Sequence, residues 1–426
     1  DISAAPLFPF FSVDFLKRNC YHYAASKHSE SDMKALDLGN PKVLSTVLRL
    51  VIPAMIAQFI NVLYSIVDRI YVGNIAQIGD TALAAVGVCA PIATLISSFA
   101  FLIGTGGAPL FSMALGEKKE DKASAILSNA LTALIGLALI VTAVVFLFEN
   151  PLLHTFGASE STYGYARQYL LIYAAGSLFS ITSVGLNQYI TAQGYSGIGM
   201  ATTLIGAVAN IALDPLFIFV FRMNVAAIAT VISQFLSFLF VLIFLRMKGT
   251  KIRLVLRKPD LRVIGKIVRL GISPFLIMST DSVIIIISNA VLQAHGGADG
   301  DAWITVSTVV QAFFQLLTMP MLGISTGSQP VISYNYGAKN EKIIRRAEKY
   351  IVCMCLIFTT FMTLVSLFAA KPFVSLFTGT PDIVEKSVWG IRVFMIGAIP
   401  LSFQYAFVDG LTALGQPQYA IVLSMM

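Results

Sequence analysis

Three apolar stretches of the sequence contain side chains whose oxygens could share a proton or bind a cation. Asp68 lies near the end of one stretch, Asn210 and Asp214 lie in a second, and Thr230 lies in a third. Positions i and i+4 share one face of a helix, so the Asn210 amide and the Asp214 carboxylate are predicted to point the same way. A charged residue inside an apolar span is costly, and its default interpretation is a functional one.

The depths of these four residues within their helices predict that they lie in one layer. At about 1.5 Å per residue, Asp68 lies about 6 Å from the outer end of its helix, Thr230 about 9 Å, Asp214 about 12 Å and Asn210 about 18 Å. We therefore predict one cation-binding layer. It is either a coupled pair of carboxyl groups that shares a proton or an oxygen cage for Na⁺, the metal candidate at the Asp68/Asp214 pair.

Purely structural roles remain open as alternatives for individual residues of this set. Asp68 would serve as an anchor near the headgroups if it paired with Arg69. Asp214 would be an N-cap, with Pro215 at the first position of a broken helix. Thr230 alone is more often a hydroxyl that packs one helix against another.

Further polar residues are candidates for binding substrate or for coupling. Asp281 is placed near mid-membrane, about 20 Å from the outer end of its helix, and suits a cationic substrate, whereas Asp409 lies nearer the cytoplasmic end. Gln315 belongs to an aromatic and methionine-rich run, 313–321, that either lines an adaptable lipophilic cavity or packs in the core. The remaining candidates are Gln58 and Asn61.

Two blocks of the form Thr-Gly-x-x-Pro-x-x-Ser-x-x-x-Gly, at 105–116 and 326–337, favour bending and close helix packing. Direct contact with substrate is the alternative. The residues interpreted as hinges or packing sites are Pro53, Gly106, Pro109, Pro215, Pro274, Gly327 and Pro330.

The elements that position these residues are membrane helices. Of 426 residues, 57% are hydrophobic and only 12% are charged, against about 25% in soluble domains. Stretches of 36, 46, 23 and 37 residues lack Asp, Glu, Lys and Arg. A span needs about 20 apolar residues, so a soluble protein is excluded, and so is a β-barrel with its alternating strands of about 10 residues. We predict helices at 45–72, 81–115, 123–148, 163–191, 197–221, 224–246, 263–294, 302–335, 346–369, 383–413 and from 417 onward.

The loops differ in charge. Those at 116–122, 246–269 and 337–349 hold 3, 9 and 5 Lys or Arg residues, whereas the opposite loops hold only Arg222, Lys371 and Lys386. The positive-inside rule predicts a multi-pass protein of the inner (plasma) membrane with a cytoplasmic N-terminus. The basic loops account for the net charge of +7, so the charge does not indicate a nucleic acid partner. The expected partner is the lipid bilayer. The linker 247–262 is interpreted as a solvated connector, with contact to anionic lipid as the alternative.

The chain resembles itself at a shift of 221 residues. The shift pairs Pro53 with Pro274, the block 105–116 with 326–337, and Thr191 with Thr412. Six helices per repeat give both halves the same orientation, as in transporters with parallel repeats. The fold class is therefore an all-α polytopic membrane protein with two pseudo-symmetric six-helix lobes. The shift also carries Asp68 onto Asn289, so the cation site is predicted in the first half only.

The expected organisation is an N-terminal extension at 1–43, an N-lobe at 44–246, the basic linker at 247–262 and a C-lobe at 263–426. The first methionine is Met33, and we expect residues 1–32 to be non-native or disordered. By the repeat, up to about 59 residues are missing at the end, so the second lobe is truncated after the start of helix 11 and lacks helix 12. We expect this fragment to transport poorly.

Taken together, these segments resemble the multidrug and toxin extrusion (MATE) family, prokaryotic type, from about residue 44 to 426. The resemblance is carried by Pro53–Gly73, Gly104–Gly116 with its echo Ser325–Gly337, Asn210–Pro215 and Ala226–Gln234. It implies twelve helices in two lobes around a V-shaped cleft, and a first-lobe cation site at Asp68, Asn210, Asp214 and Thr230. Asp281 is close to the acid of helix 7 in one branch, about one residue out, and Asp409 does not align with that branch's acid on helix 10.

The sequence contains no phosphate-binding loop, zinc pattern or serine-hydrolase elbow, so we expect no enzyme and no cofactor beyond the coupling ion. The hypothesis is a monomeric secondary antiporter. It would export lipophilic, often cationic small molecules in exchange for H⁺ or Na⁺, by rocking its two lobes. A lipid or lipid-linked-oligosaccharide flippase of the same superfamily is the alternative, and a membrane scaffold is a third.

Overall fold

The structure, a computed structural model, describes residues 35–73, 79–156, 158, 160–221, 226–295, 300–377 and 380–425, without the side chains of some helical residues, among them Asp281. Within these ranges the regular structure is helical throughout. The helices are α3 (Val43–Gly73), α4 (Gly79–Gly116), α5 (Glu120–Thr155), α6 (Glu160–Ala192), α7 (Ser196–Phe221), α8 (Ala226–Arg246), α9 (Leu261–His295), α10 (Gly300–Gly337), α11 (Glu341–Val374), α12 (Pro381–Ile396), α13 (Ala398–Ala413) and α14 (Pro417–Ser424).

The predicted helices are confirmed within a few residues at most of their ends. Eight helices in the described ranges are long and apolar enough to cross a membrane, and α12 with α13 would form a ninth span. The fold is therefore the polytopic helical protein that the uncharged stretches predict. The largest boundary differences are in α5, which continues to Thr155, and in α11, which begins at Glu341 rather than near 346.

The helix predicted at 383–413 is wrong in one respect, because it is two helices that meet at an angle of 47°. Gly397 separates α12 from α13. Pro400 follows three residues later, and its ring nitrogen cannot donate a hydrogen bond to the carbonyl of Ile396, which it also crowds. Pro400 lies in the first turn of α13, where a missing N–H costs little.

Prolines inside other helices leave those helices connected, as α5 and α7 show. In α5, Phe148 has non-helical angles (φ −117°, ψ 20°) three residues before Pro151, so the helix kinks there and continues. In α7, the helix runs from Ser196 to Phe221 with Pro215 inside it. The alternative of a broken helix with Asp214 as its N-cap is therefore wrong, because Asp214 lies within a continuous helix.

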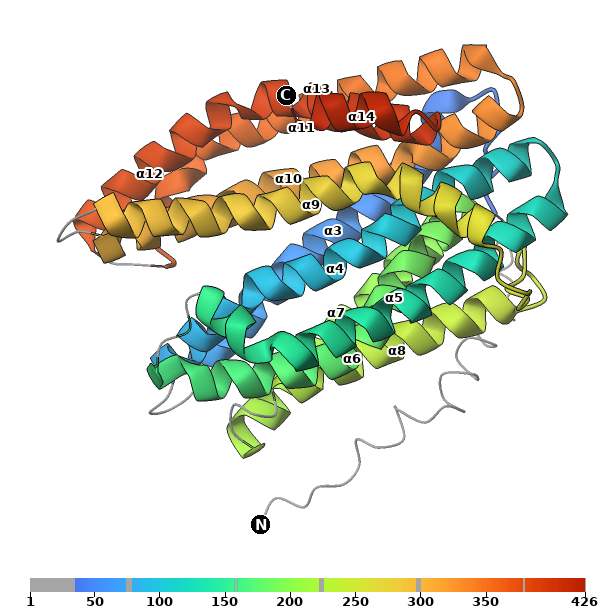
Figure 1. Ribbon diagram of the computed structural model, residues 1–426. Helices are drawn as coiled ribbons and strands as arrows, with labels where there is room; N and C mark the ends of the chain where they lie inside the picture. Colours follow the sequence, from blue (N-terminus) through green and yellow to red (C-terminus); the bar gives the residue numbers. More distant parts are fainter. Residues whose placement is uncertain are drawn as a thin grey trace.

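The helices form two bundles, which we call the N-lobe (α3–α8) and the C-lobe (α9–α14) (Figure 1). The core of each lobe includes residues from the start of a helix of the other lobe. Val43, Val47 and Leu50 of α3 are buried in the core formed by α10, α11 and α13, and Ile267 of α9 is buried in the core of the N-lobe. The first helix of each lobe thus begins inside the other lobe.

The repeat predicted from the sequence is confirmed by the backbone. Lys118 and Lys339, 221 residues apart, are the two described non-glycine residues with positive φ, and both have a φ of 58°. The pair Gly194 and Gly415, at the same offset, also has positive φ, 92° and 74°. Left-handed residues just after a helix end the helix in a defined direction. Both lobes therefore turn their chains by the same local geometry.

Side-chain contacts repeat at the same offset. The Ser112 hydroxyl donates to the carbonyl of Ala192 at 3.1 Å, and the Ser333 hydroxyl donates to the carbonyl of Ala413 at 2.8 Å. Each bond ties the second helix of a lobe to the end of the lobe's fourth helix, counting α12 and α13 as one. The duplication thus extends to individual hydrogen bonds.

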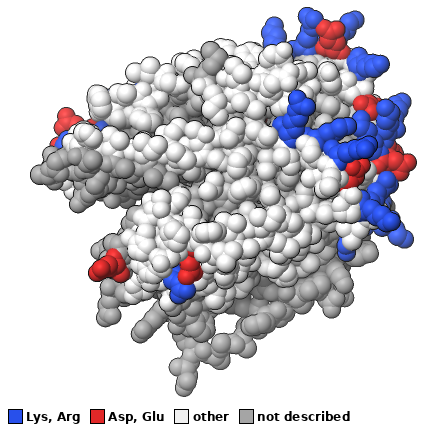
Figure 2. All heavy atoms as spheres, viewed as in Figure 1, with Lys and Arg blue, Asp and Glu red and all other residues white. Residues whose placement is uncertain are grey.

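The lobes meet at one end and diverge at the other (Figure 1). At the meeting end α4 crosses α10, where a Cβ on Gly116 would overlap the carbonyl of Tyr334, and one on Gly337 would overlap the carbonyl of Met113. Lys and Arg gather at this end, and the surface is hollowed between the lobes at the opposite end (Figure 2). We call the meeting end the basic end.

Candidate functional site

The acids predicted for the N-lobe come from two packed helices, α3 and α7. Asp214 is fully buried and Asn210 is 2% exposed. The Asn210 amide Nδ2 donates to Asp214 Oδ1 at 3.3 Å, as the i, i+4 spacing predicts. Asp68 on α3 lies close enough to Asp214 for a hydrogen bond between the two carboxyl groups. The structure thus brings three of the four predicted residues together.

Acceptor atoms in this cluster outnumber donors. Asn210 Oδ1 and Asp214 Oδ2 are buried, and neither accepts a hydrogen bond from an N–H or hydroxyl of the described residues. A hydrogen bond between two carboxyl groups needs a proton, because two carboxylates only accept. Buried polar atoms without a partner are costly. The donor set therefore suits a shared proton or a small cation bound by oxygen ligands.

Thr230, the fourth predicted residue, is half-buried on α8. Helix α8 is antiparallel to α7, and the Ser237 hydroxyl donates to the Thr202 carbonyl at 3.1 Å. A Cβ on Gly206 would lie 2.5 Å from Ser237 Oγ. Asn210 lies about two turns after Thr202 on α7, and Thr230 lies about two turns before Ser237 on α8, so Thr230 reaches about the level of Asn210.

Tyrosines surround the acid pair, and sequence reasoning missed them. Tyr64 lies one turn before Asp68 on α3, near both acids and Tyr173. Tyr169 of α6 lies near Asp68 and Tyr64, and its ring stacks on that of Tyr173 at 6.3 Å and 9°. The i, i+4 spacing of Tyr64 with Asp68 was a usable signal. Nothing in the sequence placed Tyr169 near Asp68.

Gln58 and Asn61, the other candidates on α3, contact each other. The Asn61 amide Nδ2 donates to Gln58 Oε1 at 3.2 Å, three residues back on the same helix. Both side chains are half-buried. They extend the polar face of α3 from Asp68 towards the middle of the helix.

The C-lobe has its own buried acid, Asp409 of α13, which is 8% exposed. The Gln329 amide Nε2 of α10 donates to Asp409 Oδ1 at 2.9 Å. Glu348 of α11, which the sequence analysis counted with a loop, lies nearby: a Cβ on Gly410 would be 2.9 Å from both of its carboxylate oxygens. Asp409 is thus held by a neutral amide donor rather than by another carboxyl group.

The remaining substrate candidates are less defined. The side chain of Asp281 is outside the described part of the structure. Gln315 is half-buried on α10. Around it, Phe313 is 3% exposed and packs edge-on against Phe373 at 5.2 Å, and Met321 is fully buried. These two residues of the aromatic run belong to the core of the C-lobe, which favours the packing interpretation for them.

The glycine and proline blocks lie where the lobes touch. A Cβ on Gly106 would meet Gly271 of α9 at 2.6 Å, and one on Gly327 would meet Ala54 of α3 at 2.7 Å. Between the blocks is a cavity of about 10 Å³, room for one water molecule, lined by residues that include Pro109 and Pro330. Close packing between the lobes is therefore one role of both blocks.

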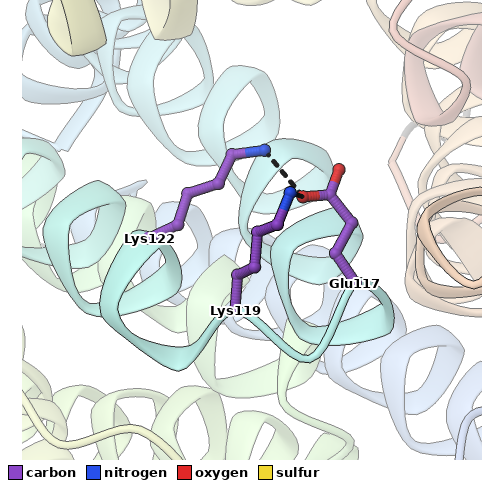
Figure 3. Close-up of polar contacts among 3 residues, drawn as sticks. All are labelled: Glu117, Lys119 and Lys122. Carbon is purple, nitrogen blue, oxygen red and sulfur yellow. Dashed lines mark hydrogen bonds and ion pairs between the residues drawn. The ribbon is translucent and has the colours of Figure 1, made fainter.

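Several charged residues of the basic end form ion pairs with one another. Glu117 accepts hydrogen bonds from Lys119 at 3.1 Å and Lys122 at 3.0 Å, both to the same carboxylate oxygen (Figure 3). The hydrogen bond from Lys122, and then that from Lys119, lowers the pKa of Glu117 below its ordinary value. In the linker, Arg257 pairs with Asp121 at 3.1 Å. Part of this charge is thus paired within the protein.

Two duplicated helical bundles that meet at a basic end, with buried polar clusters inside, define a polytopic membrane protein of the two-lobe transporter class. A profile of the MatE family matches residues 53–216 and 275–426, which is most of the chain. The protein therefore belongs to the MatE family, the multidrug and toxin extrusion transporters.

Similar proteins are known by sequence and by structure. "Multidrug export protein MepA" of Staphylococcus haemolyticus is 28% identical over 378 residues, covering 88% of this chain and 82% of the relative. The protein of that name from Staphylococcus aureus strain MSSA476 is 27% identical over 397 residues, covering 90% and 84%.

A Pyrococcus furiosus transporter described under "Reverse polarity of binding pocket suggests different function of a MOP superfamily transporter" has a TM-score of 0.83 and 23% identity, covering 90% of this chain and 85% of that chain. A structure described as "Outward-facing conformation of a multidrug resistance MATE family transporter" has a TM-score of 0.83 and 22% identity, covering 94% and 87%. These similarities establish the fold.

Proposed function

We propose that the protein is a secondary active antiporter that exports lipophilic, often cationic small molecules in exchange for H⁺ or Na⁺. The observation that carries the proposal is the buried cluster of Asp68, Asp214 and Asn210, in which two carboxyl groups face each other and two oxygens accept no hydrogen bond from an N–H or hydroxyl of the described residues. The names of the staphylococcal relatives, which are multidrug export proteins, support small-molecule substrates.

In this proposal the basic end faces the cytoplasm, by the positive-inside rule, and the N-terminus is cytoplasmic. The state described here is then outward-facing, because the lobes are closed at that end and diverge at the other. One chain supplies both lobes of the cleft, so we propose a monomer in the plasma membrane.

The transport cycle follows from the chemistry of the cluster. In the outward-facing state, H⁺ or Na⁺ neutralises the two carboxyl groups, and Thr230 adds a ligand if the ion is Na⁺. A coupling ion can drive a conformational change only if it binds the two states differently. We propose that the loaded cluster favours release of substrate and return to the inward-facing state, where the ion leaves and a cytosolic compound binds.

Reconstituted vesicles test the proposal. Ethidium efflux is measured with an imposed proton gradient, with an imposed Na⁺ gradient and with neither. The gradient that accelerates efflux identifies the ion, and Asp68→Asn with Asp214→Asn is expected to remove the acceleration. Unchanged acceleration in the double variant would refute the site, and scrambling of labelled lipid without ethidium efflux would favour the flippase. Asn187→Ala, which removes a polar side chain elsewhere in the N-lobe, serves as the control.

A further inference from the structure

The segment 35–42, just before α3, lies across the seam between the lobes at the basic end. On the N-lobe side, the Leu36 amide donates to the carbonyl of Gly194 at 3.1 Å, and Lys251 Nζ donates to the carbonyl of Leu36 at 3.2 Å. On the C-lobe side, Asn335 Nδ2 of α10 donates to the carbonyl of Leu38 at 2.8 Å. The segment is therefore attached to both lobes.

The attachment to the C-lobe is more than one hydrogen bond. The Leu38 side chain is 1% exposed and belongs to the apolar core formed with α10, α11 and α13. Gly39 lies against the ring of Tyr334, so that a Cβ there would be 3.2 Å from Cε1. Burying a leucine side chain is favourable, so this contact stabilises the closed seam.

The segment itself is stiffened by its own side chains. Asp37 Oδ1 accepts a hydrogen bond from the Gly39 amide at 3.0 Å, and Asn40 Oδ1 accepts one from the Lys42 amide at 2.9 Å. Such turns hold the backbone locally without help from a helix or sheet. The segment is therefore stiff, so separation of the lobes strains its attachments rather than stretching the segment.

The spacing of the two attachments limits how far the lobes can separate. Leu36 and Leu38 are two residues apart, and two residues reach at most about 7 Å when fully extended. Separation of the lobes by more than that must break either the bonds at Leu36 or the contacts of Leu38. No stretch of slack chain lies between the two points.

The linker that leads from the N-lobe into α9 is also held by hydrogen bonds. The linker ends at Asp260, whose amide donates to Asn129 Oδ1 of α5 at 2.7 Å, and the Arg257 amide donates to Ser128 Oγ at 2.8 Å. Helix α9 begins at the next residue, Leu261. The chain is therefore held by the N-lobe until the residue at which it enters the C-lobe.

We propose that residues 35–42 form a lock that holds the basic end closed, and that Asn335 of α10 attaches this lock to the C-lobe through its hydrogen bond to Leu38. The inward-opening step then has to release this segment from one lobe. The proposal rests on the alternating opening in the proposed function, but it does not depend on the coupling ion or on the acid cluster.

The test measures the distance between the lobes at the basic end by pulsed electron resonance. Spin labels are placed on the exposed residues Glu120 of the N-lobe and Lys342 of the C-lobe, after replacement of the native cysteines, with the whole chain in lipid nanodiscs. Asn335→Ala removes the hydrogen bond to Leu38 on the C-lobe side, and Lys251→Ala removes the hydrogen bond to Leu36 on the N-lobe side. Asn187→Ala is the matched control, because its amide donates to the Gly199 carbonyl at 3.2 Å within one lobe.

Asn335→Ala is expected to raise the ratio of long to short distances about fivefold, the effect of losing one hydrogen bond of about 1 kcal/mol. Lys251→Ala should change the ratio in the same direction by less, and Asn187→Ala should leave it unchanged. The proposal is overturned if both lock variants keep the wild-type ratio, or if Asn187→Ala raises it equally. If Asn335→Ala fails to fold, the exposed Lys251→Ala decides alone. A failure of gradient-driven efflux would refute the proposed function without moving these distances.

Discussion

The two lobes share a backbone but not a polar interior. Their turns, their left-handed residues and the bonds of Ser112 and Ser333 repeat at an offset of 221 residues. The acids do not. Asp409 corresponds in the N-lobe to Gln188, and Asp68 corresponds in the C-lobe to Asn289. The two lobes thus repeat the geometry that the fold requires, and each lobe contains its own buried acids.

The position of the acids differs as well. In the N-lobe, Asp68 and Asp214 lie in the half of the lobe away from the basic end, and they face each other. In the C-lobe, Asp409 lies four residues from the end of α13 at the basic end and is bonded to the Gln329 amide. The Asp409 carboxylate accepts its hydrogen bond from an amide and needs no proton for it, whereas a hydrogen bond between Asp68 and Asp214 needs one.

The largest expected effect therefore separates Asp214 from Asp409. Asp214→Asn should reduce gradient-driven ethidium efflux to that of protein-free vesicles, because the coupled pair is lost. Asp409→Asn should retain gradient-driven efflux and instead lower the free energy of unfolding by about 1 kcal/mol, because the new amide oxygen still accepts from Gln329 and only the charge on the acceptor is lost. Efflux and thermal unfolding in detergent are measured for both variants. Equal loss of coupling in the two would show that the lobes share the coupling site.

A second prediction concerns the crossing of α4 and α10, where the lobes are alike. Gly116→Ala and Gly337→Ala should each destabilise the closed basic end by about 1–3 kcal/mol, because each added methyl overlaps a backbone carbonyl of the other lobe. The controls are Gly136→Ala and Gly265→Ala, where nothing lies within 4 Å of the added carbon. They should raise the unfolding midpoint slightly, since alanine favours a helix by about 1 kcal/mol. A large difference between the first two variants would contradict the symmetry.

A smaller effect is expected for the repeated serine bonds. Ser112→Ala and Ser333→Ala should each lower the free energy of unfolding by about 1 kcal/mol, because each removes one buried hydrogen bond to a carbonyl. The two sites lie in separate lobes, so the double variant should show the sum of the two effects. Thermal unfolding of the three variants measures this. An effect confined to one serine would mean that the two lobes unfold as unequal units.

Much of the fold could be predicted because long apolar runs and charged loops are local signals. The repeat was visible in the block 105–116 and its echo, since small residues at a helix crossing cannot be replaced freely. The break at Gly397 was missed because the run around it is apolar on both sides. Pro400 was the local signal for it. Residues 35–42 gave no signal, because their role depends on contacts with Gly194 and Asn335 far along the chain.

The candidate site divides in the same way. The pairing of Asn210 with Asp214 follows from helical spacing, and depth within the helices selected Asp68. Tyr169 and Tyr173 lie on α6, and only the packing of helices brings them to the acids. Glu348 was counted with a charged loop, because α11 extends about two turns beyond its apolar run and carries the residue under α13.

The smallest effect is expected at the charged surface of the basic end, where the lobes differ again. Glu117 is bonded to two lysines, whereas the C-lobe has Ala338 at the corresponding position. Because the pKa of Glu117 is lowered in the folded state, the bonds stabilise the protein above the ordinary carboxyl pKa of 4.5 and are lost as the pH falls through the folded value.

Glu117→Gln should therefore lower the free energy of unfolding at pH 7 by at most about 1 kcal/mol, and the difference from the parent protein should vanish in acid below that value. Glu341→Gln, which breaks the exposed pair with Arg345 in the C-lobe, should have a smaller effect, because both partners are largely in water. Unfolding midpoints measured between pH 3 and pH 7 compare the two. A difference that persists unchanged at pH 3 would show that Glu117 acts through packing rather than through its charge.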